Sequence, residues 1–281
     1  MRTIGEAPAE EPQTVQGHDA ARGADGGALA GAPIELDGVE HSFGELRVLE
    51  RLDLGVNAGE VVGLVGPSGC GKSTLLELIA ALREPTAGAI RVGGEASPRA
   101  RLARCAFMPQ RDLLLPWLSA IDNAALALRN RGASRSEARA DAHPLFERFG
   151  LAGFERTRPP ELSGGMRQRI AFLRTLLAGK PVLLLDEPFA SLDAITRGEM
   201  QEWLARALAS EARTVVLVTH DVEEALYLCD RIAVLSPRPA AIVSELAATA
   251  PRALPRTEAV TDQSFVAARE RALWTMREGS R

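Results

Sequence analysis

The chain has 281 residues, of which 46% are hydrophobic and 25% charged, and this length and composition fit one large domain with a full apolar core. Its net charge of −4, with no basic block, argues against a nucleic-acid partner. Three cysteines without metal-ligand spacing or a disulfide framework favour a reducing cytosolic setting. No apolar run approaches about 18 residues and no signal-peptide core is present, so we expect neither a membrane span nor export.

Residues 1–33 are rich in Ala, Gly, Glu and Asp and lack aromatic residues and hydrophobic periodicity, which predicts a disordered leader. A misassigned start codon explains this segment equally well. Alternating hydrophobicity then predicts a strand at Ile34–Asp37, and a further strand is expected near Leu52–Val56 before a turn at Asn57-Ala58-Gly59.

A glycine-rich loop follows the apolar run Val61–Val65 and precedes a helical pattern at Leu75–Leu82. In this strand–loop–helix context, G-x4-G-K-[ST] binds phosphate, because glycines let backbone N–H groups turn inward and the helix N-terminus adds partial positive charge. We expect Lys72 to reach the β- and γ-phosphates and Ser73 to bind Mg²⁺. The same helix N-terminus predicts a lowered thiol pKa for Cys70. The predicted nucleotide-binding residues of this phosphate loop are Gly66, Pro67, Ser68, Gly69, Cys70, Gly71, Lys72, Ser73 and Thr74.

Four later apolar runs are short, do not alternate and are mostly β-branched, which predicts strands buried on both faces of a parallel sheet: 106–108, 182–185, 215–218 and 232–235. Helical periods between them, such as Met200–Leu208, predict an α/β fold. Residues from about 111 to 180 hold helical patterns without a convincing strand, so we expect a helical insertion there. The tail, 247–281, is expected to carry a short helix near Phe265–Met276.

A second informative stretch is Leu162-Ser163-Gly164-Gly165-Met166-Arg167-Gln168. Ser163 has the position of an N-cap for a helix over Met166–Leu177, and a capped helix N-terminus opened by glycines is also an anion site. Arg167 and Arg169 stand in the first turn, where the helix dipole disfavours cations. A bound polyphosphate would offset that conflict.

The run Val182–Leu185 delivers Asp186 and Glu187 to the carboxyl edge of the sheet, where ligands of α/β proteins bind. Together with the phosphate loop and the stretch around Ser163, this pattern resembles the ATP-binding-cassette (ABC) ATPases. The resemblance implies an α/β P-loop NTPase cassette over residues 34–246, with a mainly parallel core sheet, an N-terminal antiparallel β subdomain and a helical insertion. It also implies that Asp186 meets Mg²⁺ through water and that Glu187 is the general base or orients the hydrolytic water.

Weaker matches extend the resemblance. Gln110 fits the glutamine loop, Ser191-Leu192-Asp193 fits the D-loop on the dimer seam, and His220 fits the switch histidine at the γ-phosphate. Phe43 stands where the family commonly stacks a tyrosine on adenine, a change that removes a hydroxyl and keeps the stacking face. The implied roles are catalytic for Lys72, Glu187 and His220; nucleotide-binding for Phe43, the phosphate loop, Gln110, Ser163, Gly164, Gly165 and Asp193; and metal-binding for Ser73, Gln110 and Asp186.

One cassette without a membrane span implies separate permease subunits and a second cassette, because the family's signature residues meet the γ-phosphate held by the other subunit. The loop Leu113–Leu118 is more apolar than a solvent-facing loop should be. It either packs into the helical core or receives a coupling helix of a membrane protein. Three segments resemble the cassettes of nitrate, sulfonate, taurine and thiamine-pyrimidine-precursor importers: 115–117, 163–169 and 235–239. Residues 110–117 and 200–204 favour the last of these branches.

We therefore expect an ATPase that uses ATP and Mg²⁺ to drive solute uptake at the cytoplasmic face of a bacterial membrane. A periplasmic or lipid-anchored solute-binding protein is an expected indirect partner. The alternative is a soluble ABC ATPase of DNA repair or translation. That alternative would need a coiled coil or zinc fingers between the phosphate loop and the signature, or two cassettes in one chain.

Overall fold

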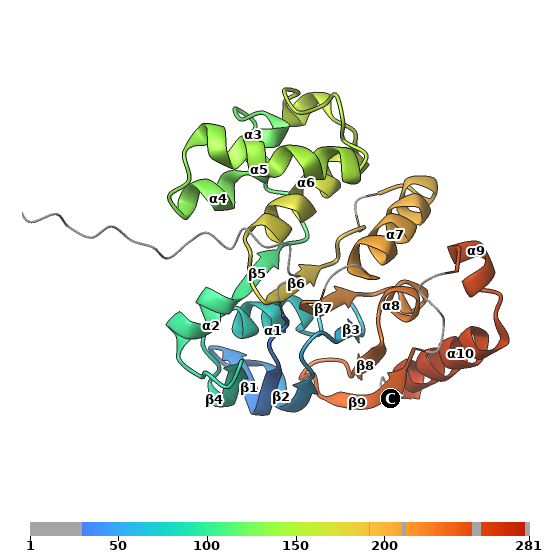
Figure 1. Ribbon diagram of the computed structural model, residues 1–281. Helices are drawn as coiled ribbons and strands as arrows, with labels where there is room; N and C mark the ends of the chain where they lie inside the picture. Colours follow the sequence, from blue (N-terminus) through green and yellow to red (C-terminus); the bar gives the residue numbers. More distant parts are fainter. Residues whose placement is uncertain (1–29, 191, 210–211, 249–253, 279–281) are drawn as a thin grey trace, which may run out of the picture.

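The phosphate-loop strand lies inside a six-stranded sheet with the order β5-β6-β7-β3-β8-β9 (Figure 1). A computed structural model describes residues 30–190, 192–209, 212–248 and 254–278, so most of the predicted leader and Ser191 lie outside the described residues. All neighbouring strands are parallel except β8 and β9, which confirms the mainly parallel core sheet. The strands are β3 (Val61–Val65), β5 (Cys105–Met108), β6 (Val182–Asp186), β7 (Thr214–Thr219), β8 (Arg231–Leu235) and β9 (Ile242–Ala247).

A second, three-stranded sheet is antiparallel, with the order β2-β1-β4: β1 (Ile34–Phe43), β2 (Leu46–Val56) and β4 (Ala87–Val92). It confirms the expected N-terminal β subdomain, although β1 continues well beyond Asp37 because a register shift absorbs the break in alternation at Gly38. We did not predict β4, whose Ala- and Gly-rich sequence has low strand propensity. Gly88 is needed there because a Cβ would lie 2.3 Å from the Gly38 carbonyl oxygen.

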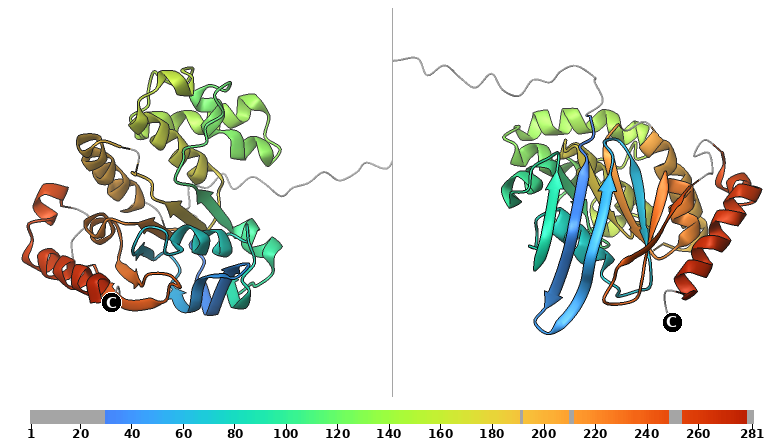
Figure 2. Two further views of the ribbon diagram at one scale, coloured as in Figure 1. Left: turned by 180° about the vertical axis from the view of Figure 1, so that it is seen from behind. Right: turned by 90° about the horizontal axis from the view of Figure 1, so that it is seen from below.

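Two apolar cores cover the two faces of the six-stranded sheet, as the two-residue period of a strand requires. Val62 and Leu64 face a core that also contains α1 (Lys72–Ile79) and the antiparallel sheet. Val61 and Val65 face the other core, which contains α6, α7, α8 and α10. Figure 2 shows α10 outside the sheet, on the side away from β1 and β2. The helices are α2 (Pro98–Arg104), α6 (Gly164–Leu177), α7 (Ala194–Ala209), α8 (Val222–Leu228), α9 (Arg256–Ala259) and α10 (Gln263–Glu278).

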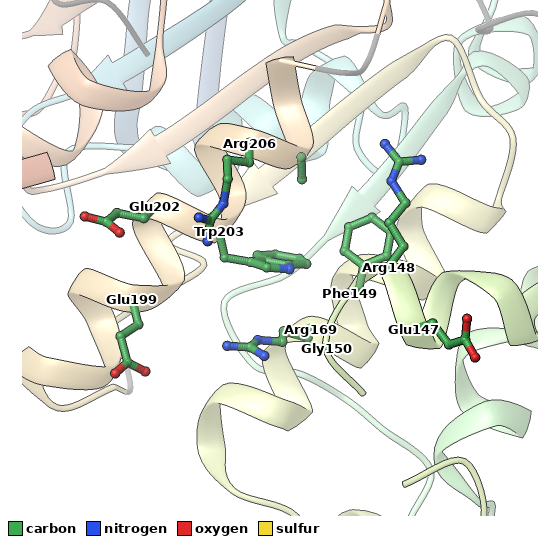
Figure 3. A pocket seen from close by; sticks show the side chains of 10 residues that line it. Glu147, Arg148, Phe149, Gly150, Arg169, Glu199, Glu202, Trp203 and Arg206 are labelled. Carbon is green, nitrogen blue, oxygen red and sulfur yellow. The ribbon is translucent and has the colours of Figure 1, made fainter. Parts of the chain in front are cut away.

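The segment from 111 to 180 is helical and contains none of the assigned strands, as expected. It comprises α3 (Ala120–Ala124), α4 (Leu126–Asn130), α5 (Arg135–Arg148) and α6, which stand above the core sheet in Figure 1. Its junction with α7 is aromatic: Trp203 lies 5.2 Å from Phe149 and 5.3 Å from Phe172 between ring centroids. The Arg169 guanidinium lies over the Trp203 ring at 5.8 Å, and Phe149, Arg169 and Trp203 line a cleft of about 520 Å³ (Figure 3).

The helix expected near Phe265–Met276 is α10, which buries Phe265, Ala268 and Ala272. Arg256 and Arg269 both form ion pairs with Glu223 on α8. These contacts fix the C-terminal helices against the core. Among the described residues, none of the helices is long and apolar enough to cross a membrane.

Candidate nucleotide-binding site

The phosphate loop has the conformation that its glycines permit. Gly69 and Gly71 have φ values of 76° and 127°, a region that favours glycine. A Cβ on Gly71 would also lie 2.8 Å from side-chain atoms of Val48 and Leu49, so glycine is required there for two reasons. The buried Lys72 ammonium donates to the carbonyl oxygens of Gly66 at 2.8 Å and Pro67 at 3.0 Å. Helix α1 begins at Lys72, three residues earlier than predicted, because the loop runs directly into it.

A cleft of about 380 Å³ opens over this loop. It brings together most of the predicted nucleotide-binding residues although they come from distant parts of the sequence. Leu46, Val48 and Arg238 were not predicted and also line it. The predicted residues that line it are Phe43, Ser68, Gly69, Gly71, Lys72, Ser73, Thr74, Gln110 and Glu187.

Phe43 stands at the mouth of the cleft and is 41% exposed. Its ring meets His41 edge-on, with centroids 4.8 Å apart, and the Arg83 guanidinium lies over it at 5.0 Å. These two contacts fix the plane of the ring. A fixed aromatic ring with exposed surface is suited to stacking on a nucleobase.

Ser73, which lines the cleft, contacts the buried Asp186 although 113 residues separate them in the sequence. The Ser73 hydroxyl donates to Asp186 Oδ1 at 3.0 Å. Burial raises the pKa of the Asp186 carboxyl, and the Ser73 hydrogen bond opposes that effect. Because Mg²⁺ prefers oxygen ligands, a hydroxyl beside a carboxylate fits a magnesium site.

Glu187, Gln110 and His220 converge at the carboxyl ends of β6, β5 and β7. The imidazole Nδ1 of His220 lies 3.1 Å from Glu187 Oε2, and Gln110 Nε2 donates to the same oxygen at 3.4 Å. Glu187 has a φ of 41°, unusual for a residue with a side chain, and its N–H donates to the carbonyl of Val218 at 2.8 Å. Strained backbone of this kind is concentrated at functional sites.

The signature and D-loop residues occupy helix N-termini instead of the cleft. Ser163 caps α6 by accepting from Met166 N–H at 3.2 Å. Asp193 accepts from Ile195 and Thr196 N–H at 3.2 and 3.1 Å, and the Thr196 bond is the main reason that its pKa is lowered. Ser163, Gly164, Gly165 and Asp193 therefore do not line the cleft over Lys72. Five other predicted residues are also outside its lining: Gly66, Pro67, Cys70, Asp186 and His220.

The ABC transporter family model matches residues 49–190. The chain is 49% identical over 203 residues to the aliphatic sulfonates import ATP-binding protein of Rhodococcus jostii, covering 72% of this chain and 79% of that protein. The chain belongs to the ABC transporter family. Identity is 46% over 192 residues to the formylaminopyrimidine import ATP-binding protein of Halalkalibacterium halodurans, covering 68% of this chain and 74% of that protein. It is 44% over 203 residues to a taurine import ATP-binding protein of Burkholderia pseudomallei, covering 72% and 77% respectively.

A solved ABC cassette has the same fold. The dimeric, post-hydrolysis structure of the cassette MJ0796 bound to ADP and Pi matches with a TM-score of 0.66 and 30% identity, covering 76% of this chain and 98% of that one. The protein is therefore an ATP-binding ABC ATPase. The comparisons confirm the predicted class, the ATPase subunit of an ABC importer, and do not support a soluble DNA-repair or translation ATPase.

Two interpretations of this cassette's sequence need correction. The cations in the first turn of α6 do not require a polyphosphate, because Arg167 pairs with Asp112 at 3.2 Å and Arg169 lies over Trp203. The lowered thiol pKa expected for Cys70 is wrong. Its side chain is 2% exposed, and burial raises the pKa of the thiol more than the charge of Lys72 lowers it. A helix N-terminus does not activate a thiol that is packed against the apolar core.

A buried carboxyl beside Glu187 and His220 was not predicted. Glu224 on α8 is 3% exposed, accepts from Gln201 Nε2 at 3.0 Å, and lines the same small pocket as Glu187, His220 and Arg197. Burial raises the pKa of Glu224 to about 7, while hydrogen bonding from Gln201 and the Arg197 charge oppose that rise. An acidic residue in the first turn of a helix is ordinary in sequence, so no local signal identified it.

Proposed function

We propose that this protein drives the uptake of a small solute through separate permease subunits, acting at the cytoplasmic face of a bacterial membrane with residues 34–246 as its cassette. The observation that supports a permease partner is the loop after Gln110. Leu114 is buried, whereas Leu113 and Trp117 are 56% and 68% exposed. Large apolar side chains exposed together are typical of protein-interaction sites.

The loop is held rigidly, which reduces the ordering cost of docking. Leu113 has a φ of 46°, and the Arg174 guanidinium donates to the carbonyls of Leu113 at 2.8 Å and Asp112 at 2.6 Å. The buried Asn123 side chain accepts from Leu115 N–H at 2.7 Å and donates to its carbonyl at 3.1 Å. Since Gln110 begins this loop and its amide reaches Glu187, docking on the loop can alter the hydrolytic site.

In the proposed reaction, the phosphates of ATP lie over the phosphate loop and Phe43 stacks on adenine. Lys72 exchanges the carbonyls of Gly66 and Pro67 for β- and γ-phosphate oxygens. Glu187 orients the attacking water or accepts its proton. Its Oε2 is held by Gln110 and His220, whereas none of the described residues donates to its Oε1. His220 contacts the γ-phosphate. This arrangement supplies positioning and charge stabilisation, which phosphoryl transfer needs most.

Magnesium is the proposed second cofactor. Ser73, Gln110 and Asp186, the last through water, would hold it, and the 3.0 Å contact between Ser73 and Asp186 supports that assignment. When bound, Mg²⁺ neutralises charge on the β- and γ-phosphates.

A second cassette is proposed to complete each site. Ser163 and the two following glycines do not line the cleft over their own Lys72, yet a capped helix N-terminus is an anion site. In the pair, Ser163, Gly164, Gly165 and Asp193 of one chain would close over the nucleotide of the other. Nucleic acid is not among the proposed partners.

The proposed solute is a sulfonate, taurine or a pyrimidine, as the relatives' names suggest, or nitrate, which only the sequence resemblance implies; the same resemblance implies that the pyrimidine is a thiamine precursor. The matched relatives import aliphatic sulfonates, formylaminopyrimidine and taurine. A periplasmic or lipid-anchored solute-binding protein would deliver the solute to the permease. The assignment is tested by measuring uptake of each solute in cells with and without this gene.

The permease contact is testable by site-specific crosslinking. A photoreactive residue replaces Trp117, and the crosslinked proteins are identified by mass spectrometry of membranes from the native host. We expect an integral membrane permease subunit. Trp274 on α10, which is similarly exposed, provides the matched control position and should not crosslink to it. Crosslinks to ribosomal or DNA-repair proteins from Trp117 would overturn the importer assignment.

A further inference from the structure

Arg238 lines the nucleotide cleft on a segment that is fixed to the antiparallel sheet. It follows β8, the strand next to the phosphate-loop strand. Ala240 N–H donates to the carbonyl of Val48 at 2.8 Å, and Glu50 N–H donates to the carbonyl of Ala240 at 3.0 Å. The backbone that carries Arg238 is therefore held to β2, which also lines the cleft.

The guanidinium of Arg238 points at the phosphate loop. A Cβ built on Gly69 would lie 3.5 Å from Arg238 Nη2, so the two groups are within ordinary contact distance. Other arginines around this cleft are paired: Arg47 with Glu50, and Arg83 with Glu77. Among the described residues, Arg238 forms no ion pair or hydrogen bond, so its five donors are available to a ligand.

We propose that Arg238 is a nucleotide-binding residue whose guanidinium holds the phosphate chain of ATP beside Gly69 of the phosphate loop. The proposal rests on nucleotide binding by this cleft and is independent of the transported solute. A guanidinium presents a planar set of donors that matches phosphate oxygens. Lys72, the other cation in the cleft, stands at the start of α1, so the two would contact the phosphates from different elements.

Arg238 should contribute to ATP binding more than to the hydrolytic step. Arg238 is not among the groups that meet Glu187, the proposed water-orienting residue. An interaction made equally in the ground state and the transition state raises KM when it is lost, with a smaller effect on kcat. Because Arg238 is exposed to solvent, we expect its loss to weaken ATP binding by about tenfold, and added salt to reduce that difference.

The test compares Arg238→Gln, Arg238→Lys and the control Arg47→Gln, which removes the same charge from a neighbouring arginine that has a carboxylate partner. ATP, ADP and adenosine are each titrated against a fluorescent nucleotide bound to the full chain, and the KM and kcat for ATP are measured. We expect Arg238→Gln to weaken ATP and ADP about tenfold, to leave adenosine unchanged and to raise KM by the same factor. Arg238→Lys should recover part of the loss.

Equal weakening of adenosine would assign Arg238 to the base and overturn the phosphate contact. If Arg238→Gln binds ATP as tightly as the control Arg47→Gln does, the proposal is overturned altogether. Circular dichroism melts establish that each variant is folded. Failure of the unmodified protein to bind ATP would instead refute the proposed nucleotide site, so the two failures are distinguishable.

Discussion

Replacing Glu224 with glutamine should change how the stability of the cassette depends on pH. Burial, helped by the charge of Asp221, raises the pKa of this carboxyl from 4.5 to about 7, and it outweighs the opposing hydrogen bonds from Gln201 and Thr219 and the charge of Arg197. The folded protein therefore holds this proton more tightly than the unfolded chain does. Stability contributed by Glu224 is fully present below about pH 4.5 and is lost as pH rises toward 7.

The magnitude follows from the free energy of a pKa change, about 1.4 kcal/mol for each unit. A pKa raised from 4.5 to about 7 makes the ionised form of Glu224 about 3 kcal/mol less favourable in the folded protein than in the unfolded chain. At pH 5 a small part of this cost is already present. Between pH 5 and pH 8, the unfolding free energy of the unmodified protein should therefore fall by about 2 kcal/mol more than that of Glu224→Gln.

The assay is urea denaturation at pH 5 and pH 8 without nucleotide, and the quantity compared is the change in unfolding free energy between the two pH values. Other titrating groups contribute equally to both proteins and cancel. Glu199→Gln, which removes an exposed carboxyl from the facing helix α7, controls for the loss of a charge. If Glu224→Gln shows the same change with pH as the unmodified protein, Glu224 does not titrate in this window and the reasoning is refuted.

Three further predictions concern the nucleotide site. Glu187→Gln should retain ATP binding and lower turnover at least about a hundredfold, roughly 3 kcal/mol of barrier, in a phosphate-release assay; near-normal turnover would exclude the water-orienting role. Mixed Lys72→Ala and Ser163→Arg chains should trap nucleotide at one site per heterodimer, whereas trapping at none, with heterodimers proven, would mean that each chain completes its own site. Because Cys70 is buried and its thiol pKa is raised, maleimide should label it slowly unless the chain is unfolded by urea, and fast labelling blocked by MgATP would contradict this.

Local pattern in the sequence determined much of the fold. The strand before the phosphate loop, the helix after Ser163 and the buried parallel strands were predictable because hydrophobic period, glycine spacing and capping act over a few residues. Strands β4 and β9 were not predicted. Ala87–Val92 becomes a strand only because it pairs with β1, and Ile242–Ala247 because it pairs with β8.

The sequence by itself determined which residue types are available for ATP chemistry, since the phosphate loop and the Asp186-Glu187 pair carry it in contiguous motifs. Only the tertiary structure decided how these residues meet: Ser73 with Asp186, and Glu187 with Gln110 and His220. It also decided the burial of Cys70, which reversed the expected direction of its pKa. The physical reason is that desolvation and charge interactions depend on distances between segments far apart in the chain, and no local pattern encodes those distances.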